Sequence, residues 1–323
     1  MTRVSLGRVL QIIREEGDTL ILCHRNPDPD TLGSAFALKH IIEHYGSQVF
    51  VACSDNASQK LSFITQGESL EYVERDYKKI IAVDVASPSQ LGDLQFLADR
   101  VDLIIDHHEM NNRFATYYED FGAACAEIIY ELYALAKIKM PKHFFECIYA
   151  GISGDTGGFR YSNVTRRTME YGSYAMERGI DYAEINRIIF DTKTLGQVRA
   201  EKLTGEKMKL LCDGAFSVIL FTNEMKNDNE ICDEDITDIV NYIRSIEGVL
   251  VAVSIKQGTK DENKYSISSR ANCDIDVSKI CAMLGGGGHQ RAAGASVIAS
   301  SPEEAYEACV PLFEKAVKEY KLR

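Results

Sequence analysis

The sequence predicts an α/β protein of two domains: an N-terminal parallel-sheet domain with flanking helices, a smaller mixed α/β C-terminal domain, and a cleft between them. The first reason is length, because 323 residues are about twice the usual size of one domain. The second is that short apolar runs alternate with helical patterns in the first half and restart after residue 212. We therefore expect a first domain over 1–193, a linker helix over 194–211 and a second domain over 212–323.

Four short apolar runs in the first half predict buried strands. They lie at residues 19–23, 48–53, 79–83 and 101–105. Between the first two runs, apolar residues at helical spacing predict an amphipathic helix over about 32–42. The order strand, helix, strand implies a parallel sheet joined by right-handed crossovers.

The remaining elements follow in the same way. From residue 122 to about 189 the pattern is mostly helical, interrupted by small and polar residues at 151–162 that predict a loop. The segment 194–211 is charged and mildly helical and has no strand signal. The second domain is expected to contain strands at 215–221, 249–255 and 265–270, four consecutive glycines at 285–288, and a helix over 302–320.

Composition excludes several classes of function. The chain has 36 Lys and Arg against 48 Asp and Glu, a net charge of −12, so a basic surface for long duplex DNA is not expected. No apolar run approaches the roughly 18 residues of a membrane span, and no signal peptide is expected. The nine cysteines are odd in number and form no Cys-x-x-Cys pair, which indicates reduced thiols in the cytoplasm.

Acidic and imidazole side chains come just after the predicted strands. These residues are His24, Asp28, Asp30, Asp84, Asp106, His107, His108 and, in the glycine-rich segment, Asp155. Because the carboxyl ends of parallel strands meet at one edge of a sheet, we expect them to lie together and to need cations between them. Carboxylates with a few imidazoles suit manganese or magnesium better than zinc. Two such ions roughly 3.5–4 Å apart form the usual centre for phosphoester hydrolysis.

Each of these groups also has a purely structural interpretation. Asp28 and Asp30 could form a solvated turn, and Asp84 could begin a helix as its N-cap. The segment 106–108 could cap a strand end. Their occurrence together, in the chain order that one sheet edge requires, favours the metal centre. By contrast, Arg167 is interpreted as part of a solvated helix start.

These clusters resemble the motifs of the DHH phosphoesterase superfamily. Residues 24–34, Asp84, 106–111 and 154–157 are similar to its four motifs, and 268–270 and 285–294 resemble its DHH-associated C-terminal domain of the first type. The length and the two-domain arrangement are closest to the branch of nanoRNases that also dephosphorylate 3′-phosphoadenosine 5′-phosphate (pAp). That branch is related to the catalytic core of the RecJ exonuclease.

The resemblance implies a role for each matching residue. His24, Asp28 and Asp84 would ligate one ion, and Asp84 would bridge to a second ion. His108 would contact the scissile phosphate or the leaving group, and Asp106 would orient an imidazole. The other ligands of the second ion would be Asp30, His107 and Asp155, and the second domain would bind the non-scissile phosphate and terminal nucleotide through Arg270, Gly286, Gly287, Gly288 and His289.

Three positions depart from the pattern of the superfamily. Pro29 stands where glycine is usual, and Gly154 where threonine is common. Gln90 stands where an arginine often occurs, a change that could alter how a phosphate is steered. None of the three removes an expected metal ligand.

The resemblance implies a hydrolase with two Mn²⁺ or Mg²⁺ ions, monomeric or homodimeric, that degrades short oligoribonucleotides to mononucleotides and converts pAp to AMP. Charge favours a short substrate, because residues 209–323 hold 13 Lys and Arg against 18 Asp and Glu. An alternative is hydrolysis of cyclic di-AMP or of a linear dinucleotide. A manganese pyrophosphatase would lack the Gly-Gly-Gly-His signature, and a non-catalytic nucleotide sensor would be expected to have lost a ligand.

Overall fold

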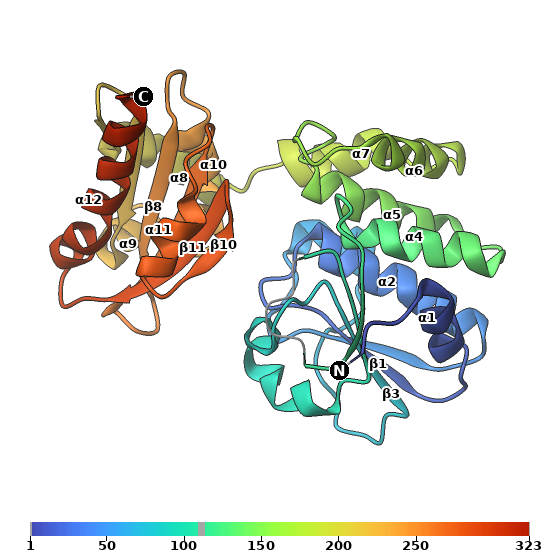
Figure 1. Ribbon diagram of the computed structural model, residues 1–323. Helices are drawn as coiled ribbons and strands as arrows, with labels where there is room; N and C mark the ends of the chain where they lie inside the picture. The colour runs from blue at the N-terminus through green and yellow to red at the C-terminus, as the bar shows by residue number, and fades with distance from the viewer. Residues whose placement is uncertain (1, 109–113, 323) are drawn as a thin grey trace. The chain divides into compact units, whose positions relative to one another are not determined.

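The chain folds into two compact units, Met1–Thr192 and Lys193–Arg323, as seen in a computed structural model that describes residues 2–108 and 114–322 (Figure 1). The first unit is built on a parallel sheet and the second on a mixed sheet, which confirms the predicted α/β class. Within the described ranges, no helix is both long enough and apolar enough to cross a lipid bilayer.

Five strands in the described part of the first unit form a fully parallel sheet, in the order β2-β1-β3-β4-β5. They are β1 (Thr19–Leu22), β2 (Val49–Ala52), β3 (Lys79–Val83), β4 (Leu103–Asp106) and β5 (Thr116–Glu119). The first four coincide with the predicted apolar runs, whereas β5 was not predicted. Since β1, β3 and β4 are neighbours and run the same way, the residues that follow these three strands lie at one edge.

Helices cover both faces of this sheet. One face packs against α1 (Leu6–Ile13), α2 (Pro29–His44), α4 (Cys125–Ala136) and α5 (Lys142–Asp155). The other face packs against η2 (Pro88–Arg100) through leucine and alanine side chains. The smaller elements of this unit are η1 (Gln59–Leu61), α3 (Ser62–Thr65), α6 (Arg166–Glu177), α7 (Tyr182–Asn186) and η3 (Arg187–Asp191).

Helix α2 begins where the first group of candidate ligands lies. The Asp28 side chain accepts hydrogen bonds from the backbone N–H groups of Asp30 and Thr31, and Pro29 occupies the first turn. Further along, Gly33 allows α2 to approach α5 closely, because a Cβ atom there would lie 2.4 Å from the Cys147 carbonyl oxygen. The start of α2 is thereby held against the end of α5.

The loop predicted at 151–162 is wrong in its first part, because α5 continues to Asp155. The small residues that suggested a loop allow close packing instead. A Cβ atom on Gly151 would lie 2.7 Å from both the Ala126 Cβ and the Asp30 Oδ1 atoms. A glycine in this helix therefore marks a close approach between helices, which a local pattern cannot distinguish from a turn.

Six strands in the described part of the second unit form a mixed sheet in the order β10-β11-β9-β8-β7-β6. They are β6 (Lys209–Leu211), β7 (Phe216–Phe221), β8 (Val251–Gln257), β9 (Lys264–Ala271), β10 (Gly287–His289) and β11 (Ala292–Ile298). β7 and β8 are parallel, and the other neighbouring pairs are antiparallel. Strand β6 lies in a segment where we expected none, since it is a short edge strand without an apolar run.

Helices also lie on both faces of the second sheet. α11 (Val277–Met283) and α12 (Pro302–Lys321) pack on one face. α8 (Leu195–Lys207) and α10 (Ile239–Arg244) pack on the other, so the segment expected to be a linker helix contributes to the core of this unit. The remaining short helices are α9 (Asn223–Asp228) and η4 (Glu234–Ile236).

Candidate metal centre

The predicted acidic and imidazole side chains of the first unit lie together at the carboxyl edge of the parallel sheet. They form overlapping groups in which one possible ligand atom from each residue lies within 4.8 Å of the others. These groups are His24, Asp28 and Asp84; Asp30, His107 and Asp155; and Asp84, Asp106, His107 and His108. The end of the motif at 109–111 lies outside the described residues.

His24 is held with one ring nitrogen directed at the carboxylates. Its Nδ1–H donates to the Arg25 carbonyl oxygen at 2.8 Å, because a carbonyl can only accept. Its Nε2 then lies 3.6 Å from Asp28 Oδ2 and 3.4 Å from Asp84 Oδ2. The N-cap hydrogen bonds of α2 engage Oδ1 of Asp28, so its other oxygen faces the histidine. The first group therefore offers one imidazole nitrogen and two carboxylates.

Asp30 is the fully buried member of the second group. Its two oxygens accept hydrogen bonds from the backbone N–H groups of Cys125 (2.7 Å) and Ala126 (2.9 Å) at the start of α4. The positive end of the α4 dipole thus stabilises the charge on this carboxylate.

His107 is oriented by a backbone carbonyl in the same manner as His24. Its Nδ1–H donates to the Gly122 carbonyl oxygen at 3.1 Å. Its Nε2 lies 3.3 Å from Asp155 Oδ2 and 3.9 Å from Asp30 Oδ2. Asp155 is the last residue of α5, so the second group takes one side chain from α2, one from α5 and one from the residue that follows β4.

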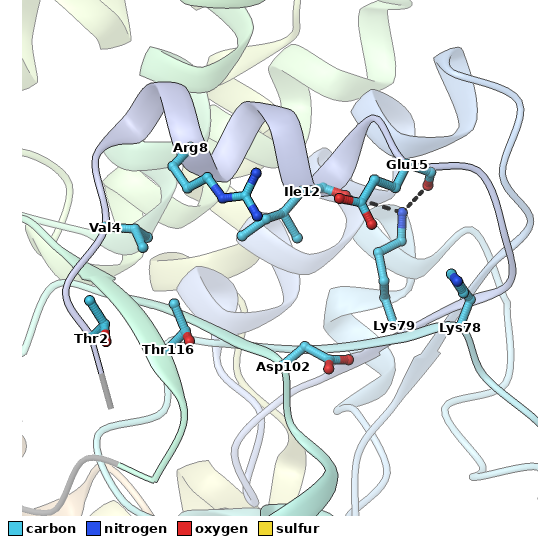
Figure 2. Close-up of a pocket in the computed structure, with 9 residues that line it drawn as sticks. All are labelled: Thr2, Val4, Arg8, Ile12, Glu15, Lys78, Lys79, Asp102 and Thr116. Atoms are coloured by element: carbon cyan, nitrogen blue, oxygen red, sulfur yellow. Dashed lines mark hydrogen bonds between the residues drawn. The ribbon is translucent and has the colours of Figure 1, made fainter.

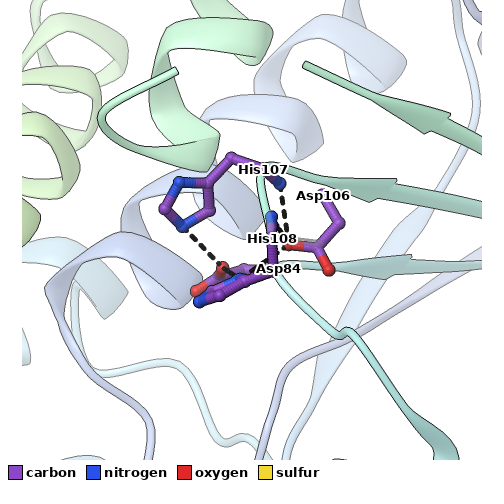
Figure 3. A group of neighbouring side chains, drawn as sticks. All are labelled: Asp84, Asp106, His107 and His108. Atoms are coloured by element: carbon purple, nitrogen blue, oxygen red, sulfur yellow. Dashed lines mark hydrogen bonds and ion pairs between the residues drawn. The ribbon is translucent and has the colours of Figure 1, made fainter. Parts of the chain in front are cut away.

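Asp84 offers one carboxylate oxygen to each of the first two groups. Figure 3 shows the side of Asp84 that faces His107. Oδ2 faces His24 Nε2 at 3.4 Å, and Oδ1 faces His107 Nε2 at 3.5 Å. The residue directly follows β3 and has a φ of 57°, in the left-handed region that aspartate tolerates better than most residues. Its backbone N–H donates to the Ile105 carbonyl oxygen, which holds this turn to β4. One carboxylate is therefore placed to serve two ions.

Asp106 and His108 form a pair beside these groups. Asp106 Oδ1 accepts hydrogen bonds from the backbone N–H of His107 (2.7 Å) and from the ring Nδ1–H of His108 (2.9 Å). This fixes the His108 ring and places its Nε2 on the side away from Asp106. Burial lowers the pKa of His108, but its contacts with Asp106 and Asp84 outweigh burial and raise it to about 10. The buried Asp106 carboxylate therefore holds the His108 imidazole in one orientation.

Two buried atoms at the centre make the strongest case for a cation. Asp84 Oδ1 and His107 Nε2 have no hydrogen-bond partner among residues 2–108 and 114–322. A buried polar atom without a partner costs about 1–3 kcal/mol, so such atoms are rare in folded proteins. A divalent ion between them would satisfy both. The surrounding set of four carboxylates and two imidazoles fits Mn²⁺ or Mg²⁺.

The electrostatic balance of the site also favours bound positive charge. Burial lowers the pKa of His24 and His107, but the carboxylates beside them outweigh burial and raise both pKa values well above the ordinary range. Burial raises the pKa of Asp155 to about 6, and it also raises that of Asp30. The carboxylates thus draw protons onto the site, and ligand atoms that bind protons tightly also bind metal ions once deprotonated.

The structure relates two of the departures from the superfamily pattern to each other. A Cβ atom on Gly154 would lie 2.9 Å from Pro29 Cβ and 3.2 Å from Pro29 Cγ. The proline ring therefore occupies the space that a side chain at 154 would need. The third departure, Gln90, accepts hydrogen bonds through its side-chain oxygen from the N–H groups of Ala86 (2.6 Å) and Ser87 (3.2 Å). It braces the turn that follows Asp84.

We expect the change Gly154→Thr to destabilise the protein by about 1–3 kcal/mol, because an added side chain would overpack against the Pro29 ring. The double variant Pro29→Gly/Gly154→Thr should recover part of this loss. Urea unfolding of the four proteins in a double-mutant cycle measures the coupling. If the effects of the two changes on the free energy of unfolding are additive, the Pro29 ring and a side chain at residue 154 do not compete for space.

A separate hollow of about 490 Å³ lies at the opposite edge of the sheet, near the amino ends of β3 and β5 (Figure 2). Its lining includes Arg8, Lys78 and Lys79 together with two acidic residues. The Lys79 ammonium group donates to the backbone carbonyl oxygens of Ile12 and Glu15 at the end of α1. Its charge is therefore used within the fold, and the hollow contains none of the candidate ligands.

The predicted substrate-binding residues of the second unit lie on β9 and at β10, the two strands on either side of β11. Arg270 on β9 is paired with Ala292 on β11, which is paired with His289 on β10. Because residues in register share a face of the sheet, Arg270 and His289 lie on the same face two strands apart. Gly286 and Gly288 permit the close pairing of β10, since a Cβ atom at either would lie within 2.6 Å of a β11 carbonyl oxygen. Gly287 belongs to the same exposed edge strand.

Sequence reasoning missed several polar contacts around the site. Arg167 is not part of a solvated helix start, because it contacts three carboxylates, including the fully buried Glu127. Asn163 donates hydrogen bonds to backbone carbonyls on both sides of the site. The available signal was the pair Glu127 and Glu131, the two acidic residues of the largely apolar helix α4, because a buried carboxylate needs a partner.

Comparison with known protein families gives the same division of the chain. Residues 18–152 match the model of the DHH family, N-terminal domain, and residues 217–319 match that of the DHHA1 domain. The two matched ranges together cover well over half of the chain. The chain contains a DHH domain followed by a DHHA1 domain. The resemblance expected from the motifs is thereby confirmed for both domains.

Characterised relatives match this DHH protein along most of its length. The bifunctional oligoribonuclease and PAP phosphatase NrnA of Thermus thermophilus is 27% identical over 300 residues, which cover 90% of this chain and 88% of the relative. NrnA of Bacillus subtilis is 25% identical and is covered to 90%. The cyclic-di-AMP phosphodiesterase GdpP of Geobacillus thermodenitrificans is also 25% identical, but the match covers 47% of that longer protein. These relatives indicate a hydrolase.

A solved structure with the same fold is an exopolyphosphatase-related protein from Bacteroides fragilis. The TM-score is 0.83, and the alignment covers 98% of this chain and 96% of the other at 22% sequence identity. At this identity the likeness establishes the fold, and the assignment of a substrate depends on other observations.

Proposed function

We propose that this protein is a two-metal phosphohydrolase that degrades short oligoribonucleotides to mononucleotides and removes the 3′-phosphate of pAp. The observation that carries the proposal is Asp84, one of whose carboxylate oxygens faces His24 and the other His107. This is the arrangement that a bridging carboxylate between two ions requires. The proposed ion is Mn²⁺, with Mg²⁺ as the other candidate.

The chain's own residues would divide the work in the following way. His24 and Asp28 would hold one ion with Asp84, while Asp30, His107 and Asp155 would hold the other. The two ions would supply positive charge to the phosphoryl group and to the attacking water. The His108 ring, fixed by Asp106, would contact the scissile phosphate or the leaving oxygen.

The substrate assignment draws on the second unit and on the relatives. Arg270 and His289 share a face of the second sheet next to the glycine-rich edge strand, where they could contact a second phosphate and its nucleoside. Residues 209–323 carry more acidic than basic side chains, which favours a substrate with few phosphates. The proteins named NrnA match most of this chain, and their names record action on oligoribonucleotides and on pAp.

The test is product analysis with Mn²⁺ on pAp, RNAs of two to five nucleotides, cyclic di-AMP and pyrophosphate. We expect AMP from pAp and mononucleotides from the RNAs, both lost after chelation of the metal. Faster cleavage of cyclic di-AMP than of pAp or RNA would contradict the substrate assignment. Turnover of pyrophosphate alone would contradict it as well, and binding of two ions without hydrolysis of any substrate would indicate a nucleotide sensor.

We expect Arg270→Ala to reduce kcat/KM for pAp and dinucleotides by roughly 10- to 150-fold, the equivalent of one charge-assisted contact of about 1.5–3 kcal/mol. The minimal phosphoester bis-p-nitrophenyl phosphate lacks the second phosphate, so its slow hydrolysis should change little. Steady-state kinetics on both substrates measures the difference. An equal loss on both would assign Arg270 to the fold or to the metal site instead.

A further inference from the structure

The turn between β5 and α4 controls two candidate ligands of one ion. The Gly122 carbonyl oxygen accepts the hydrogen bond that orients the His107 ring. A few residues later, the N–H groups of Cys125 and Ala126 hold both oxygens of Asp30. A shift of this turn would therefore move His107 and Asp30 together.

Arg167, near the start of α6, holds this turn from outside. Its guanidinium group donates to both oxygens of Asp120 (2.8 and 3.2 Å), to Glu127 Oε2 (3.1 Å from Nε) and to Glu131 Oε1 (3.1 Å). Glu127 is fully buried and also accepts the backbone N–H of residue 123. The packing is tight, because a Cβ atom on Gly122 would lie 2.4 Å from Arg167 Nη2.

Asn163 connects the same turn to a third candidate ligand. Its side-chain Nδ2 donates to the carbonyl oxygen of Ala123 at 3.2 Å and to that of Asp155 at 3.1 Å. One amide group thus ties the backbone of the turn to the backbone of the ligand at the end of α5. Arg167 and Asn163 come from one short segment. Their contacts hold the turn that orients His107 and Asp30, and they hold the backbone of Asp155 directly.

We propose that Arg167 and Asn163 are positioning residues that set the affinity of the ion site formed by Asp30, His107 and Asp155. This assignment rests on the proposed two-metal centre. A planar guanidinium can bind three carboxylates at once, which the point charge of lysine cannot reproduce. The buried charge of Glu127 keeps the guanidinium in place, because an unpaired buried carboxylate is strongly destabilising.

The geometry predicts an unequal effect on the two ion sites. In the first group, His24 and Asp84 come after β1 and β3, and Asp28 is the N-cap of α2. Other contacts orient this group, such as the Arg25 carbonyl and the N-cap hydrogen bonds of α2. No hydrogen bond of Arg167 or Asn163 in the described chain reaches these residues. We call the contacts of Arg167 and Asn163 with the turn between β5 and α4 the clamp. Loss of the clamp should therefore lower the affinity of the site formed by Asp30, His107 and Asp155 and leave the affinity of the other site nearly unchanged.

The experiment is a Mn²⁺ titration followed by electron paramagnetic resonance of the free ion, with the full-length chain. Arg167→Lys and Asn163→Ala should each weaken one of two Mn²⁺ sites by about 10- to 100-fold, the usual effect of losing a partner behind a metal ligand. The rate of pAp hydrolysis at saturating Mn²⁺ should return to within about twofold of the wild type. The matched control is Arg166→Ala, whose side chain is 91% exposed and pairs with Glu170. It should leave both affinities unchanged.

Each other outcome has a definite meaning. Three results would overturn the positioning role. Both variants could keep both Mn²⁺ affinities, the two sites could be weakened equally, or Arg166→Ala could show the same loss of affinity. If Arg167→Lys does not fold, the exposed residue Asn163 decides the question through its alanine variant. If the wild-type protein binds no Mn²⁺, both the proposed two-metal centre and the proposed role of the clamp are contradicted. If the wild type binds two ions and the variants bind them with the same affinities, only the proposed role of the clamp is contradicted.

Discussion

Replacement of Asp84 should abolish the binding of both ions and lower pAp hydrolysis by more than about 10³-fold. The reason is that its two oxygens face the two ligand groups separately, at 3.4 Å from His24 and 3.5 Å from His107. Removing one carboxylate would then take a ligand from each ion and leave the imidazoles without a shared counter-charge. Metal analysis of the purified Asp84→Ala protein by mass spectrometry, together with turnover, measures the effect.

The backbone at this position calls for a second variant. Because Asp84 has a φ of 57°, alanine adds strain that is unrelated to metal binding, whereas Asp84→Asn keeps a residue that tolerates this region. Both variants should lose the ions, and Asp84→Asn should do so with little loss of stability. The matched control is Asp99→Ala, an exposed aspartate on η2, which should keep both ions. Retention of two ions with full turnover in Asp84→Asn would contradict the bridging role.

Replacement of His108 should leave both ions bound, unlike replacement of Asp84, and should reduce turnover by roughly 10²–10³-fold. This is the size expected for the loss of one contact made in the transition state. The ring is fixed by Asp106 through Nδ1, so Asp106→Asn should lose part of the same turnover by releasing the ring. Metal content and kcat, measured for His108→Ala and His107→Ala in parallel, separate the two histidines. Loss of metal in His108→Ala and its retention in His107→Ala would show that their roles are reversed.

The parallel sheet and the location of the site could be predicted because both depend on local patterns. Apolar runs marked four strands, and acidic or imidazole residues followed three of them. Strand β5 lacked that signal, since its residues Thr116–Glu119 alternate between half-buried and buried positions. A short strand of this kind is specified by its neighbour β4 more than by its own sequence.

The contacts that support the site could not be predicted, because they join residues distant in sequence. Arg167 meets Glu127 and Asp120 across 40 and 47 positions, and nothing in its local sequence distinguishes it from the exposed Arg166. In the same way, Gly151 and Gly154 indicated a loop by composition, whereas the structure shows that neighbouring helices limit the size of the side chain there. Tertiary packing decided both cases.

The contact between Pro29 and Gly154 also constrains the mutational history of the site. A chain with glycine at 29 and threonine at 154, the usual residues of the superfamily, can reach the present pair by two orders of substitution. If the proline came first, the intermediate would have carried both the ring and the threonine side chain, whose first carbon would lie 2.9 Å from the ring. If the glycine at 154 came first, the intermediate would have had glycine at both positions and no side-chain clash between them. Selection for stability therefore favours the second order, and reversion to threonine at 154 would destabilise the protein for as long as the proline remains.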